Sequence, residues 1–150
     1  MKTKLLAILL MAAVAAPVAL AAPQATAQPS LYKRLGGYDA LAAVTDDALA
    51  RFIADPQLAR FFAGMNNASK KRVRQHFVDF LCEISGGPCA YHGRDMKTAH
   101  DGMNISEQDW TAAVNDLKAT LDKFKVPAKE QGEVLGAVSS LKADIVHVAK

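Results

Sequence analysis

Two histidines lie on faces of predicted helices that otherwise carry apolar side chains. His76 follows Val73 by three residues and precedes Phe80 by four, and His100 follows Met96 by four. Residues at these spacings share one helix face. A buried imidazole needs a polar partner. Each histidine can therefore be a core residue bonded to a carbonyl oxygen or to water, or it can be a metal ligand.

A pair of such histidines on separate helices also suits a haem site. Phe77 and Met103 add further aromatic and thioether side chains to the two faces. Apolar walls hold a porphyrin, and an imidazole nitrogen binds its iron. The sequence contains no Cys-x-x-Cys-His motif, which excludes covalent attachment of the c type. Histidine coordination and packing alone are expected to hold any haem.

The only two cysteines, Cys82 and Cys89, flank the turn Gly86-Gly87-Pro88. A disulfide across this turn is one interpretation, and two reduced thiols are another. A third makes both cysteines zinc ligands together with His92, because Cys89-x-x-His92 has a tolerable spacing, although a fourth ligand is missing. The residues by themselves leave these alternatives open.

Residues 1–27 have the three parts of a secretory signal peptide: a basic start, an apolar stretch and small residues at the end. Small-residue motifs predict cleavage after Ala21 or Ala27. A retained membrane anchor is the alternative, but it needs about 20 clean apolar residues, and Pro17 interrupts the stretch. We therefore expect export, most simply to a bacterial periplasm, which is oxidising, and no membrane attachment after cleavage.

Without this segment, residues 28–150 form a near-neutral domain. The whole chain carries 18 basic and 15 acidic side chains, a formal charge of +3. Two lysines lie in residues 1–27, which contain no acidic residue, so the domain has 16 basic minus 15 acidic side chains, or +1. A charge so close to zero argues against nucleic acid as a partner. The hydrophobic content of 51% excludes a disordered chain.

Helical periodicity runs through this domain, and no alternating run requires a strand. Asn66, Asn67 or Ser69 can cap one helix, and Ser106 with Asp109 resembles a capping box for another. The fold class is therefore all-α, with four substantial helices and two or three short ones. The expected helices cover 31–34, 38–54, 57–62, 68–85, 96–101, a segment from Ser106 to 124, and a last helix with an apolar stripe of Val134, Val138, Leu141 and Ile145.

From Leu31 to the last helix, the chain resembles a group I truncated haemoglobin. The resemblance implies a shortened globin, a 2-over-2 helical sandwich around non-covalent haem b. It rests on four motifs in register over about 120 residues: Leu31-Tyr32-x-x-Leu-Gly36-Gly37, Asp55-Pro-x-Leu-x-x-Phe61-Phe62, Gly86-Gly87-Pro88 and Tyr91-x-Gly93-x-Asp95-Met96-x-x-Ala99-His100.

The resemblance also implies roles for individual residues. His100 matches the proximal iron ligand. Phe62, beside Phe61, matches the phenylalanine that wedges against the porphyrin face. The distal positions correspond to Leu49, Val73, His76, Phe77 and Leu81. The proximal and inner walls correspond to Met96, Met103, Ile105 and Ala113.

The chain departs from the family pattern on the distal side. Family members often carry a tyrosine at the position of Leu49 and a polar residue at Val73 or Phe77, which hydrogen-bond O2. Here His76 is the one obvious polar distal side chain, so we hypothesise that it is a sixth iron ligand opposite His100. The competing hypothesis places His76 at the pocket mouth beside a haem propionate, with five-coordinate iron.

The resemblance implies reversible binding of a diatomic ligand, O2, CO or NO, by an exported haem protein. Enzymatic chemistry at the same iron is the alternative: NO dioxygenation, nitrite reduction or peroxidase-like turnover, each with an electron donor as partner. Electron transfer or redox sensing is a third possibility, which suits six-coordinate iron. The sequence selects none of these, and we expect a monomer or a weak homo-oligomer.

Overall fold

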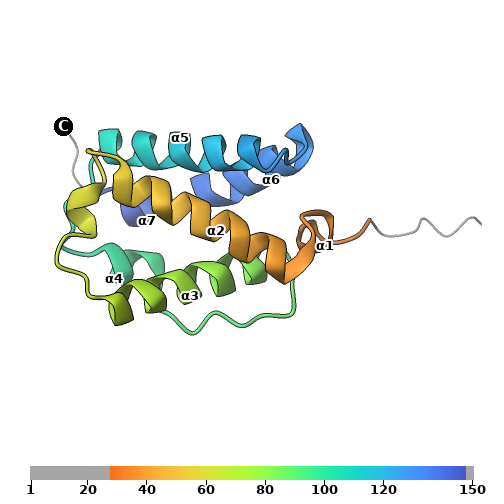
Figure 1. Cartoon of the computed structure of the whole chain (residues 1–150), viewed down its shortest axis with the longest axis horizontal. Coiled ribbons are helices and arrows are strands. Elements are labelled where there is room, and N and C mark those ends of the chain that lie inside the picture. Colours follow the sequence, from red (N-terminus) through yellow and green to blue (C-terminus); the bar gives the residue numbers. More distant parts are fainter. Residues whose placement is uncertain (1–27, 148–150) are drawn as a thin grey trace, which may run out of the picture.

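Helices account for the regular structure of residues 28–147, the part of the chain that the computed structural model describes. In Figure 1 the long helices α5 and α6 lie above α2 and α3, which gives the expected sandwich of two helix pairs. The predicted signal peptide, residues 1–27, lies outside the described residues. The elements are α1 (Leu31–Arg34), α2 (Gly37–Ala54), η1 (Ala59–Phe61), α3 (Asn67–Ile84), α4 (Met96–His100), α5 (Glu107–Lys123), α6 (Ala128–Ser139) and α7 (Lys142–Ile145).

Side-chain caps fix where the central helices begin. The Asn66 carboxamide oxygen accepts a hydrogen bond from the Ser69 backbone N–H at 2.9 Å. At the start of α5, the Ser106 hydroxyl accepts from the Asp109 N–H at 3.3 Å, and the Asp109 carboxylate accepts from the Ser106 N–H at 2.8 Å. Both predicted caps are thus confirmed, and each satisfies backbone donors that a helix start leaves unpaired.

Two predicted helices differ from the structure. The segment 57–62 contains only the short 3-10 helix η1, because the Asp55 carboxylate accepts from the Gln57 N–H at 2.6 Å and holds a turn there. The last helix is not continuous: it ends at Ser139 and restarts at Lys142. The Ser140 hydroxyl donates to the Ala137 carbonyl at 2.7 Å, and such local bonds compete with the helical backbone.

The main core lies where α2 meets α5 and α6. Its most buried members include Ala48 and Leu121, with relative exposures of 0% and 1%. The core cluster comprises Val44, Ala48, Leu49, Phe52, Leu58, Leu117, Leu121 and Val134.

None of the described helices is both long enough and apolar enough to span a membrane.

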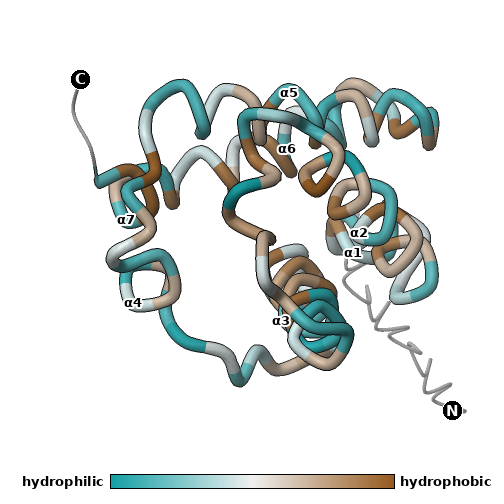
Figure 2. Tube along the Cα trace, turned by 60° about the vertical axis from the view of Figure 1, so that its left-hand side comes forward, coloured by the Kyte–Doolittle hydropathy of each residue, from teal (hydrophilic) through white to brown (hydrophobic). Residues whose placement is uncertain are grey.

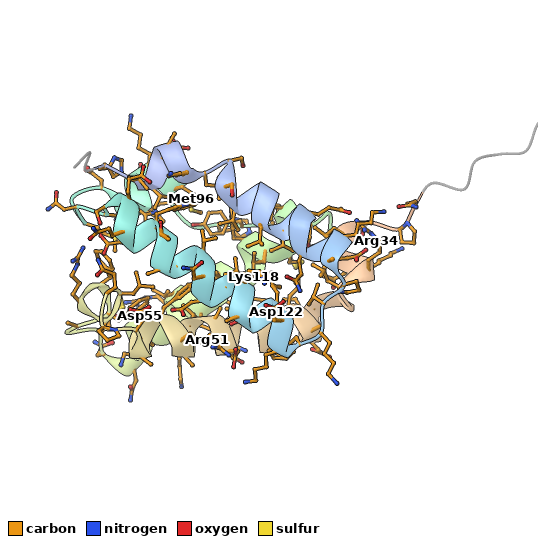
Figure 3. The ribbon with its side chains drawn as sticks, turned by 90° about the horizontal axis from the view of Figure 1, so that it is seen from above. Arg34, Arg51, Asp55, Met96, Lys118 and Asp122 are labelled. Atoms are coloured by element: carbon orange, nitrogen blue, oxygen red, sulfur yellow. A yellow bond between two sulfur atoms is a disulfide. The ribbon has the colours of Figure 1, made fainter. Side chains whose placement is uncertain are left out.

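A polar network ties α2 to α5 beside this core. The Asp47 carboxylate accepts from Arg51 Nε at 2.9 Å and from the Thr120 hydroxyl at 3.0 Å, and it also pairs with Lys123. Arg51 lies on α2 alongside α5 in Figure 3. The hydrogen bonds from Lys123 and Arg51 hold the pKa of Asp47 below its usual range, at about 2. Its ionised form therefore stabilises the contact between the two helices.

We predict that Asp47→Asn lowers the free energy of unfolding by about 1–2 kcal/mol at pH 7, because it removes a carboxylate with a depressed pKa. The folded-state pKa lies below the unfolded one, so the wild-type advantage is complete above about pH 5 and shrinks as the pH falls through 4 towards 2. Urea unfolding over this pH range measures the difference.

The matched control is Asp46→Asn, one residue earlier. Asp46 is exposed, and within the described part of the chain its one ion pair is with Arg74. Such a surface pair contributes about 0–1 kcal/mol. A deficit in Asp47→Asn that stays constant from pH 7 to the lowest pH at which the chain folds would contradict the assigned network.

Candidate functional site

His100 is held in a defined tautomer at the end of α4. Its Nδ1 lies 2.7 Å from the Met96 carbonyl oxygen, one helical turn earlier. A carbonyl can only accept, so Nδ1 must carry the proton and donate. The lone pair of Nε2 is therefore free to bind a metal, and the ring is only half-buried.

Asp95 determines where this short helix begins. Its carboxylate accepts from the Thr98 backbone N–H at 2.9 Å and from the Thr98 hydroxyl at 2.8 Å. The bond from the Thr98 N–H lowers the pKa of Asp95, so the cap is ionised at neutral pH. With α4 starting at Met96, the spacing of four residues places the Met96 carbonyl under the His100 ring.

The walls around α4 are apolar and come from the C-terminal part of the domain. Figure 2 shows α4 beside α7 and apart from α3. Met96 and Met103 are half-buried, whereas Ile105 is buried. The Ile105 carbonyl accepts from the His147 backbone N–H at 3.2 Å, which fixes this wall to the segment after α7. Met96 lies towards the end of the molecule opposite Arg34 of α1 (Figure 3).

A second apolar surface lies on α3. Val73 and Phe77 are half-buried and pack against the main core, where they join Leu49 of α2. The Phe77 ring meets the Phe52 ring edge-on, with 6.3 Å between centroids. Phe61, Phe62 and Ala113 pack against the same cluster, and Leu81 is buried in a neighbouring cluster with Leu41 and Cys82.

These two surfaces fit a large flat apolar group. Phenylalanine, valine and methionine side chains in a core are usually buried, yet Val73, Phe77, Met96 and Met103 keep part of their surface exposed. A porphyrin would complete their burial, and His100 supplies a nitrogen ligand for its iron. Both the donor and the walls therefore suit a haem.

His76 lies on α3 with its side chain exposed. Its ring meets the Tyr91 ring edge-on, with 5.9 Å between centroids. Within the described residues, no hydrogen bond restrains the imidazole. The structure thus places His76 at the solvent edge of the α3 surface that carries Val73 and Phe77.

Two residues near His76 escaped the predicted set. Phe80 is half-buried on the same face of α3 as Val73 and Phe77; the helical spacing placed it on that apolar face with His76, but not among the site residues. Tyr91 comes from the loop after α3, and its ring contacts both Phe80 and His76. Helical spacing predicts contacts within one helix only, so it could not have predicted that a loop residue contacts Phe80 and His76.

The zinc hypothesis for Cys82, Cys89 and His92 is wrong. The two cysteines form a disulfide, which leaves neither thiol to bind a metal. The described part of the chain also has no group of three or more metal-binding side chains placed to hold an ion. Of the alternatives left open by the sequence, the disulfide is the one that the structure contains.

Comparisons with known proteins agree with this geometry. Residues 30–147 match the family model of the bacterial-like globins. A group 1 truncated haemoglobin of Mycolicibacterium paratuberculosis is 35% identical over 116 residues, which cover 77% of this chain and 83% of that protein.

Solved structures show the same fold. The truncated haemoglobin of Tetrahymena pyriformis in its Fe(III) form superposes with a TM-score of 0.73 at 28% identity, covering 80% of this chain and all of that one. The 2/2 haemoglobin of Synechococcus sp. PCC 7002, solved with covalently attached haem, gives a TM-score of 0.71 at 27% identity, covering 79% and 98%.

Proposed function

Since the chain belongs to the group 1 truncated haemoglobins, a family of globin-type haem proteins, we propose that it binds haem b non-covalently and uses the iron to bind a diatomic ligand reversibly. The observation that carries this proposal is the hydrogen bond from His100 Nδ1 to the Met96 carbonyl. It orients the ring and leaves Nε2 for the iron. When bound, haem would supply an iron that takes the His100 nitrogen and a diatomic gas as ligands.

We predict that His100→Ala abolishes the Soret band of the purified protein, because no other described side chain combines a fixed free nitrogen with these apolar walls. His92→Ala is the matched control, since His92 is exposed in the loop after α3, and it should keep the band. Absorbance after titration with haemin measures both. A colourless wild-type protein that takes up no haemin would contradict the proposal.

Non-covalent attachment is supported by the state of the cysteines. Cys82 and Cys89 are joined to each other, so neither is available for a thioether bond to haem. The Synechococcus relative, in contrast, was solved with covalently attached haem.

We predict that acidified organic solvent extracts the haem completely from this protein, because no covalent bond holds it. Haem that stays with the polypeptide would contradict non-covalent attachment.

We propose further that His76 is the sixth ligand in the resting protein. Its exposed ring has no competing hydrogen bond from residues 28–147 and lies beside the half-buried face of α3. An external ligand would then have to replace His76. The apolar side chains of Leu49, Val73 and Phe77 offer O2 no hydrogen-bond donor, so O2 should be held weakly, while CO should be less affected.

We predict a low-spin ferric spectrum for the wild type and a high-spin spectrum for His76→Leu, because leucine cannot bind iron. His92→Leu should leave the low-spin spectrum unchanged. Visible absorption and electron paramagnetic resonance measure the spin state. A high-spin wild-type spectrum would exclude the sixth ligand and favour His76 at the pocket mouth. Slow O2 dissociation from His76→Leu would show that another donor is present.

Export to the periplasm is also proposed, on the composition of residues 1–27. The disulfide between Cys82 and Cys89 supports it, because such bonds persist in oxidising compartments.

We predict that full-length protein expressed in a Gram-negative bacterium is recovered from the periplasm with its N-terminus at Ala22 or Gln28. Its intact mass should rise by two hydrogens on reduction. Cytoplasmic protein that begins at Met1 would contradict export.

A further inference from the structure

The loop after α3 is fastened back onto that helix before it enters α4. In Figure 1 this loop, residues 85–95, runs back along α3. The Cys82–Cys89 disulfide makes one attachment, and the Tyr91 backbone N–H donates to the Glu83 carboxylate in a second. Each attachment joins a residue of the loop to the last two turns of α3. The disulfide at Cys89 and the hydrogen bond of its own backbone N–H therefore fix the position of Tyr91.

The Tyr91 ring lies in contact with two side chains of α3. It meets the Phe80 ring edge-on at 5.2 Å between centroids and the His76 ring edge-on at 5.9 Å. Its hydroxyl donates to the Arg94 carbonyl at 2.7 Å, and burial raises the pKa of that hydroxyl. Any Cβ at Gly93 would lie 2.2 Å from the Tyr91 ring, so only glycine allows the ring to fold back there.

This placement limits where the His76 imidazole can go. His76 and Phe80 are one helical turn apart. Because the Tyr91 ring contacts both, it occupies the space on the C-terminal side of the His76 side chain. Side chains on a helix lean towards its N-terminus. The space left to His76 therefore lies towards Val73, one turn earlier, which is part of the apolar α3 surface.

We propose that Tyr91 is the positioning residue for His76: its ring keeps the imidazole turned towards the side of α3 from which it can reach the haem iron. The inference rests on the proposed function, in which His76 is the sixth ligand. Tyr91 also bonds to the Arg94 carbonyl, directly before Asp95, the cap of the helix that carries His100. One side chain thus contacts the distal histidine and the residue that leads into the proximal helix.

The test compares Tyr91→Ala with Tyr91→Phe in the haem-loaded protein. Tyr91→Ala should show a high-spin fraction in the ferric spectrum and bind cyanide about 2- to 10-fold faster, the range expected from losing one aromatic edge contact. Tyr91→Phe keeps the ring against His76 and Phe80, so its spin state and cyanide rate should stay close to those of the wild type.

Tyr38→Ala is the matched control. Tyr38 also contacts α3, through a hydrogen bond from Gln75 Nε2 to its hydroxyl at 2.9 Å, but among the described aromatic pairs it is Tyr91, and not Tyr38, that meets the His76 ring. This variant should keep the wild-type spectrum and cyanide rate. If Tyr38→Ala and Tyr91→Ala change both to the same extent, general loosening of α3 explains the effect and the inference is overturned.

The remaining outcomes separate the inference from the function on which it rests. A low-spin wild type with an unchanged Tyr91→Ala overturns the role of Tyr91 and leaves His76 as the sixth ligand. A high-spin wild type overturns both the role of Tyr91 and the role of His76 as the sixth ligand.

If Tyr91→Ala does not fold, Gly93→Ala tests the inference instead, because the added Cβ displaces the Tyr91 ring while the tyrosine is retained. A high-spin fraction in Gly93→Ala supports the inference, and a wild-type spectrum overturns it.

Discussion

The hydrogen bond from His100 Nδ1 to the Met96 carbonyl is the interaction on which the proposed function depends. It determines which imidazole nitrogen is available to a metal, and it exists only because α4 begins at Met96. The Asp95 carboxylate fixes that start by bonding to Thr98. Five residues of helix, far too few to be stable alone, are thereby held in one place, since α4 also packs on α7.

The remainder of the domain supplies two rigid supports for this short helix. The contact of α2 with α5 carries the main core and the Asp47 network, and α3 packs on α2. The second support is the disulfide, which fastens the loop leading into α4 to the end of α3. The loop therefore connects the helix of His76 with the helix of His100 through a restrained segment.

Much of this arrangement could be predicted from the sequence because it depends on local rules. Ser106 and Asp109 form the expected capping box, and Asn66 caps α3. The four family motifs gave the fold and placed His100 at the end of a short helix. Leu49, Val73 and Phe77, to which the resemblance gives distal positions, join one apolar cluster in the structure.

Features that depend on contacts between distant segments or on weak local preferences could not be predicted in this way. The apolar stripe through Leu141 continues across the break between α6 and α7, so periodicity alone gave a single helix where the Ser140 hydroxyl interrupts it. The spacing of Cys82 and Cys89 left a disulfide, two free thiols and a zinc site with a missing fourth ligand as open alternatives. The contact between Tyr91 and His76 depends on how the loop folds back, which no spacing encodes.

The most direct test of the account is the protonation and metal coordination of His100 in the haem-loaded protein. Long-range proton–nitrogen NMR of the reduced, CO-bound protein, labelled with nitrogen-15 at histidine, distinguishes the two ring nitrogens. We predict a proton on Nδ1 of His100 and iron on its Nε2. Iron on Nδ1, or a His100 ring with no bound iron, would contradict the central claim.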